Sequence, residues 1–241
     1  MRRLIYVPIV HTAADMGSQA EALEREHVRR HGRGEWARTR RLIDEVWDGL
    51  RTRLLALDLD YRRVRIYQDG LPVCGRELDI VREVARGGSR NYALILELLD
   101  RGTEVEGTES PGLLREEYER IRSAIPKESA PRSAGLRTPS EGRMRTGELA
   151  AKAESRKAGP PDQAREEYAR EGERLLRQRD EFIGRRIDET LKEGEVGILF
   201  IGLMHRVDRF LAPDIEVQYL IHRLPFQIPP GDPGPRTRHG G

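Results

Sequence analysis

The residues best suited to chemistry in this 241-residue chain stand just after short apolar segments. His11 follows LIYVPIV, Asp69 follows a second short segment, Glu106 and Glu109 lie at and beyond the end of a third, and His205 follows VGILFI. Parallel strands end at one edge of their sheet, which is where ligands bind in open α/β folds. If these segments are parallel neighbours, two imidazoles and two or three carboxylates therefore meet there.

Such a group of side chains supports two kinds of chemistry. Imidazole and carboxylate ligands suit a divalent ion such as zinc, manganese or cobalt, with open positions for water. Without a metal, one histidine acts as a general base while a carboxylate fixes its tautomer. The expected metal ligands are His11, His205, Asp69 and Glu106, and the expected catalytic residues are His11, His205, Glu109 and Arg179. The choice among the acidic residues stays open.

Polar residues also interrupt the apolar faces of two expected helices. Asn91 lies three, four and seven residues before Leu94, Ile95 and Leu98, in the centre of their stripe. Arg179 and Asp180 fall on either side of the stripe formed by Leu176, Ile183 and Ile187. Buried polar groups need partners, so these residues form either a structural ion pair or part of a site. Asn91, Asp180 and Gln68 are the expected substrate-binding residues.

Several common enzyme classes lose support. The chain contains no H-E-x-x-H, G-x-S-x-G or Walker sequence, and no G-x-G-x-x-G between a strand and a helix. Its single cysteine, Cys74, excludes a disulfide framework and a thiolate zinc site within one chain, and we expect it to be a small buried residue rather than a nucleophile. The other four histidines are assigned no role.

The elements that position these residues alternate between strand and helix. Strands are expected at 4–10, 64–67, 103–106, 196–201 and 215–220. Helical spacing is expected from Glu35 to Leu57, around 78–85, from a cap at Ser89 to Gly102, over 113–125, in a long stretch ending before Gly194, and over 207–211. This order predicts an α/β fold with an open, mostly parallel sheet and helices on both faces.

Composition divides the chain. Only 37% of the residues are hydrophobic, and the deficit is concentrated in 126–161 and near the C-terminus. We therefore expect one α/β domain built from 1–125 and 162–226, a flexible insertion or linker at 126–161, and a disordered tail at 227–241.

Charge and hydropathy bear on partners. The chain has 43 basic and 41 acidic residues, and interleaved signs of this kind favour a solvated surface over a nucleic-acid site. The single cysteine favours a reducing, cytoplasmic compartment. No apolar run approaches the ~20 residues of a membrane span, so we expect no membrane partner. A small-molecule or peptide substrate is expected, and a homo-oligomer is left open.

Two stretches of the chain share a pattern of a strand that ends at a histidine. RDEFI at 179–183, Ile187 and Leu191 precede GILFIGLMH at 197–205, and VPIVHT at 7–12 ends the first apolar segment. These stretches resemble the TraB/TIKI-type superfamily, which includes erythromycin esterases and ChaN haem-binding lipoproteins. Its members have a polar helix before a buried strand that ends in G-x-x-H, and a first G-x-x-H in which this chain has Pro8 in place of glycine. The resemblance implies that His11 and His205 face one pocket, with chemistry ranging from metal-dependent peptide cleavage to metal-independent ester hydrolysis; some members bind haem.

We therefore expect a hydrolase-like protein whose site lies between two strand-end histidines, with Mn, Co or Zn as the cofactor or none. The alternative is a non-catalytic small-molecule-binding or sensor module that uses the same pocket.

Overall fold

A computed structural model describes residues 1–10, 25, 28–124 and 162–222. Five strands form one sheet in the order β3-β2-β4-β1-β5, and every neighbouring pair is parallel. The strands are β1 (Arg2–Ile9), β2 (Val64–Gln68), β3 (Glu104–Glu106), β4 (Val196–Gly202) and β5 (Ile215–Tyr219). The predicted open parallel sheet is confirmed. All five strands end at the same edge.

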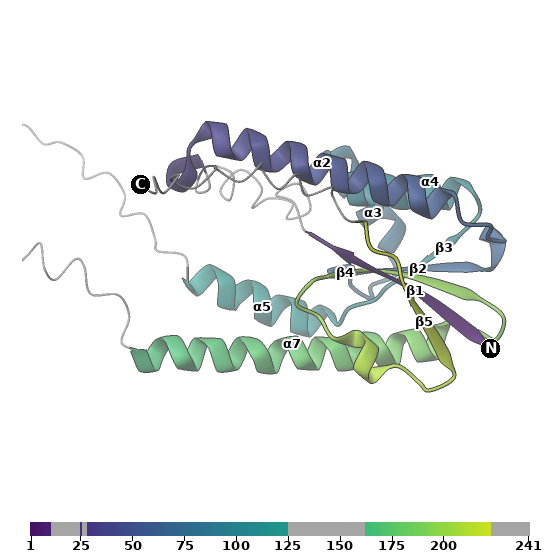
Figure 1. Ribbon diagram of the computed structural model, residues 1–241. Coiled ribbons are helices and arrows are strands. Elements are labelled where there is room, and N and C mark those ends of the chain that lie inside the picture. Colours follow the sequence, from purple (N-terminus) through teal and green to yellow (C-terminus); the bar gives the residue numbers. More distant parts are fainter. Residues whose placement is uncertain (11–24, 26–27, 125–161, 223–241) are drawn as a thin grey trace, which may run out of the picture.

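Helices cover both faces of this sheet, as predicted (Figure 1). They are α2 (Arg33–Leu55), α3 (Glu77–Arg86), α4 (Arg90–Asp100), α5 (Pro111–Ala124) and α7 (Asp162–Thr190), with short 3-10 turns η2 (Tyr61–Arg63) and η3 (Val207–Phe210). These bounds match the expected segments to within a few residues. None of the helices in the described part of the chain is both long and apolar enough to cross a membrane.

Alternation along the strands divides the core into two layers. Ile5 and Ile198 face α2, α3 and α4, and pack with Trp47, Leu50 and Ile95. On the opposite face, Leu4, Tyr6 and Leu199 pack against Ile183 and Ile187 of α7. The second layer anchors the helix that carries Arg179 and Asp180.

Two parts of the chain far apart in sequence build the sheet together. β4 pairs with β1 on one side and with β2 on the other, so it fills the centre of the sheet between earlier strands. The expected linker at 126–161 and tail at 227–241 lie outside the described residues.

Local signals account for the start of α4, the helix that carries Asn91 and Tyr92. Gly88 takes a φ of 91°, which favours glycine, and Ser89 then caps α4 by accepting a hydrogen bond from the backbone N–H of Tyr92.

The side chain of Cys74 is exposed, so the prediction of a buried cysteine is wrong. Cys74 lies in the turn between β2 and α3, where its backbone N–H donates to Glu77 Oε1 at 2.8 Å.

α7 approaches η3 closely at Gly184. A Cβ added there would lie 2.7 Å from the carbonyl oxygen of Phe210, so either backbone would have to move. We expect Gly184→Ala to lower the free energy of unfolding by about 1–3 kcal/mol despite the better helix propensity of alanine. Chemical denaturation measures this change.

Gly172→Ala is the matched control in the same helix. Its added Cβ would meet only the end of the flexible Arg120 side chain, at 3.1 Å. Stability should stay level or rise by up to ~1 kcal/mol. Equal gains in both variants would contradict the close approach at Gly184.

Candidate functional site

Three predicted residues meet where β2, β3 and β4 end. Asp69, Glu109 and His205 each offer one ligand atom, and these atoms lie within 4.8 Å of one another. All three side chains are buried. Arg179 and Asp180 of α7 are buried beside them, with only 6% and 3% of their surfaces exposed. The predicted burial of this polar pair is confirmed, although the two residues bind other partners rather than each other.

Arg179 links carboxylates from three parts of the fold. Its Nη2 donates to Asp69 Oδ1 at 2.7 Å and to Glu109, and its Nε donates to Glu109 Oε1 at 3.2 Å. Its Nη1 donates to Glu117 of α5. Charge-assisted bonds of this kind are strong, and a buried arginine is stable only with such partners. The guanidinium therefore ties α7 to the loops after β2 and β3 and to α5.

His205 lies between two carboxylates. Its Nδ1 is 2.6 Å from Asp180 Oδ1, and its Nε2 is 3.4 Å from Asp69 Oδ2. The backbone N–H of Arg206 donates to the other Asp180 oxygen at 2.9 Å, which fixes that carboxylate. With the Nδ1 proton on the Asp180 side, Nε2 is the nitrogen left for chemistry.

Two opposing effects set the pKa of His205. Burial lowers it, but the hydrogen bond to Asp180 and the charge of Asp69 outweigh burial, so the pKa lies above its ordinary value of 6.5. The imidazolium form of His205 is therefore more stable than that of a free histidine.

Glu109 is enclosed by backbone. Its own N–H and that of Thr108 both donate to the carbonyl oxygen of Leu71 at 2.9 Å, and Val73 N–H donates to the Glu109 carbonyl at 2.9 Å.

Burial raises the pKa of the Glu109 carboxyl to about 7, although Arg179 acts in the opposite direction. Glu109 therefore changes charge near neutral pH.

Gln68 and Asn91 lie behind the site. Asn91 Nδ2 donates to Gln68 Oε1 at 2.9 Å, and Gln68 Nε2 donates to the backbone oxygen of Asp69 at 2.9 Å. Neither side chain lines a described cavity, and Asp180 is likewise covered by His205. These three predicted substrate-binding residues hold the site's backbone and imidazole in place instead.

Glu106 does not join the cluster. It is the last residue of β3, where it forms ion pairs with Arg65 at 2.6 Å and Arg186 at 3.4 Å. The chain continues for three more residues before Glu109 reaches the site through an isolated bridge with Pro72. Glu109, rather than Glu106, is therefore the second acidic candidate for a metal ligand, beside Asp69. His11 lies outside the described residues.

Sequence reasoning missed Glu117. It occupies α5 three residues after Leu114 and four before Ile121, on the face those residues share. That spacing was the available signal, since an acid flanked by apolar residues on one helical face needs a buried partner.

A cavity of about 500 Å³ opens onto this cluster, and we call it the His205 pocket. Asp69, Glu117, Arg179 and His205 lie on its polar side. Its other lining residues are Ile9, Val10, Gly70, Tyr92, Leu114, Tyr118, Ile121, Leu176, Gly202, Leu203 and Met204. The volume suits a small-molecule ligand.

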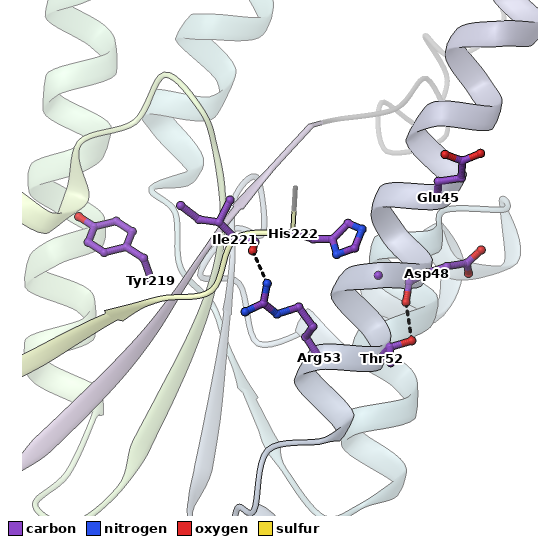
Figure 2. A pocket seen from close by; sticks show the side chains of 8 residues that line it. Glu45, Asp48, Thr52, Arg53, Tyr219, Ile221 and His222 are labelled. Atoms are coloured by element: carbon purple, nitrogen blue, oxygen red, sulfur yellow. Dashed lines mark hydrogen bonds between the residues drawn. The ribbon is translucent and has the colours of Figure 1, made fainter. Parts of the chain in front are cut away.

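A second hollow, of about 870 Å³, lies between α2 and the chain after β5 (Figure 2). Arg53 donates there to the carbonyl oxygen of Ile221 at 2.7 Å, and Thr52 donates to that of Asp48 at 2.8 Å. Most of its side chains are exposed, and none belongs to the charged cluster. The chemistry of the described residues is concentrated in the His205 pocket instead.

Comparisons with protein families, with curated proteins and with solved structures find no match to this chain. The resemblance to the TraB/TIKI-type superfamily therefore stays a prediction. The function is therefore inferred from the positions and contacts of the side chains in the His205 pocket.

The raised pKa of Glu109 predicts a pH dependence of stability. Between its ordinary value of 4.5 and about 7, the folded state keeps a proton that the unfolded state has released, so stability falls as pH rises through this window. We expect the free energy of unfolding to decrease from pH 5 to pH 8, and to decrease less steeply in Glu109→Gln. Denaturant titrations at four pH values measure both slopes.

The raised pKa of His205 acts in the same direction at higher pH, so the slope in Glu109→Gln should shrink without vanishing. Glu83→Gln, at an exposed position on α3, is the control and should keep the wild-type slope. A Glu109→Gln slope equal to that of the wild type would show that the Glu109 proton is not retained by folding.

Proposed function

We propose that this protein is a hydrolase of acyl esters or amides in which His205 activates water. The observation that carries the proposal is the position of His205 between Asp180 and Asp69 on the wall of a cavity. A carboxylate at Nδ1 orients the ring and stabilises its protonated form, as a general base requires. The second ring nitrogen lies on the side of Asp69, which also lines the cavity.

Water is the nucleophile in this proposal. Among the described residues that line the His205 pocket there is no serine, threonine or cysteine. His205 Nε2 accepts a proton from water while the water oxygen bonds to the acyl carbon. The bond from that carbon to the leaving oxygen or nitrogen then breaks, and Nε2 returns the proton to the leaving atom. The products are a carboxylic acid and an alcohol or amine.

Asp69 and Asp180 stabilise the imidazolium that forms during this step. Asp69 Oδ2 accepts a hydrogen bond from Gly202 N–H at 3.0 Å, so it is held in place beside Nε2. Arg179 donates to Asp69 from the other side and is a positioning residue. The carboxylate is thereby oriented before substrate arrives, which lowers the cost of reaching the transition state.

A divalent metal is the second candidate, favoured by the short separations among Asp69, Glu109 and His205. A histidine braced by a carboxylate is also typical of metal sites. However, Arg179 already donates to both acidic members of this set, so one cation is present between them. We therefore prefer the mechanism without a metal.

Turnover of p-nitrophenyl butyrate and of an acyl p-nitroanilide tests the proposal. We expect the wild type to hydrolyse at least one of them, with kcat/KM rising as pH increases through a pKa above 6.5 because the base must be deprotonated. His205→Ala should lower kcat/KM at least ~100-fold. His222→Ala, in the hollow of Figure 2, is the matched control and should keep the wild-type rate.

Removal of metal separates the two mechanisms. Dialysis against a chelator should leave the rate unchanged if His205 and water suffice, whereas loss of activity with recovery on adding Mn²⁺ or Zn²⁺ would assign the chemistry to a metal. Equal rates for wild type and His205→Ala would overturn the proposal. The non-catalytic binding module would then be the better description.

A further inference from the structure

The walls of the His205 pocket are apolar, whereas one end of the pocket is charged. Leu114, Tyr118 and Ile121 of α5 form one apolar side, and Leu176 of α7 adjoins them. The rest of the apolar lining comes from Ile9, Val10 and Tyr92 and from the loop after β4, where Leu203 and Met204 stand immediately before His205.

Large apolar side chains at this pocket are left open to solvent. Leu203 is 66% exposed and Met204 is 74% exposed, and Val10 and Tyr118 are exposed as well. Single exposed apolar residues are common, but a group of them around one cavity marks a binding surface. The group adjoins the imidazole that we propose as the base.

The charged end of the pocket carries an excess of negative charge. Four carboxylates, Asp69, Glu109, Glu117 and Asp180, surround Arg179 and His205. Arg179 donates to three of these acids, and no other arginine or lysine lines the pocket among the described residues. The carboxylates outnumber the positive groups even when His205 is protonated, so an anion placed here would meet net repulsion.

These observations together limit the chemistry of the ligand. We infer that the His205 pocket accepts apolar acyl compounds that carry no negative charge, with the acyl chain along α5 and the Leu203–Met204 loop. This inference rests on the proposed function and adds the substrate class to it. A volume of about 500 Å³ accommodates a medium-length chain together with its carbonyl group.

Burial of the chain should appear as a dependence on its length. A fully buried methylene contributes up to about fourfold in affinity, and an open groove buries each methylene only partly. We expect kcat/KM for p-nitrophenyl octanoate to exceed that for the acetate ester by about 30-fold. In the Leu203→Ser/Met204→Ser double variant the ratio of the octanoate to the acetate kcat/KM should fall about tenfold.

Leu42→Ser is the matched control, because Leu42 is an exposed leucine of α2 far from the pocket lining. It should keep the full chain-length preference. Both serine variants replace exposed side chains, so thermal unfolding should report intact folds for each.

A binding measurement on His205→Ala separates this inference from the catalytic proposal. Titration calorimetry with 2-decanone and with decanoate, which share ten carbons, should show at least tenfold tighter binding of the neutral ketone. The Leu203→Ser/Met204→Ser changes should weaken ketone binding in the same background. If the ketone binds in this way but the wild type shows no turnover, the inferred ligand class is supported and the hydrolase proposal is wrong.

Hydrolysis with no chain-length preference, unchanged in the double variant, would overturn the substrate class and leave the hydrolase standing. Decanoate binding as tight as that of 2-decanone would also overturn it, because the pocket would then accept an anion.

Discussion

The arrangement of the site depends on the buried guanidinium of Arg179. It bonds to Asp69 after β2, to Glu109 after β3 and to Glu117 on α5, so one side chain from α7 joins four parts of the fold. Leaving a buried charge without its partner costs about 3–5 kcal/mol, and each carboxylate here relies on the same cation. The carboxylates of the pocket are therefore held at short separations that their mutual repulsion would otherwise oppose.

The same helix, α7, also carries the carboxylate that orients the His205 ring. Asp180 follows Arg179 directly, and at ~100° per residue the two side chains leave α7 in different directions, one toward the carboxylates and one toward the imidazole. Ile183 and Ile187 pack on the sheet and fix the position of α7 relative to the ends of the strands. Sheet and helix thus bring an oriented imidazole, an adjacent carboxylate and an apolar cavity to one place, and the proposed hydrolysis rests on this combination.

The sequence predicts the helices and strands well because their signals are local. VGILFI alone predicts a buried strand, and Ser89 alone predicts a helix cap, whatever the rest of the fold. Parallel strands also predict that Asp69 and His205 meet. The choice of Glu109 over Glu106 was not predictable, because it depends on pairing of the loop after β3 with Leu71 and Pro72. The roles of Glu117 and Arg179 depend on how α5 and α7 pack, which periodicity along one helix does not specify.

Asp180 orients His205 and raises its pKa, and the ring then has its Nε2 on the side of Asp69 and the pocket. Nitrogen-15 NMR of the histidine rings across a pH titration, with the His205 signal identified by its loss in His205→Ala, measures both properties. We predict a proton on Nδ1 in the neutral ring and a pKa above 6.5, and in Asp180→Asn a lower pKa. A His205 pKa at or below 6.5 that does not change in Asp180→Asn would show that Asp180 does not stabilise the protonated ring.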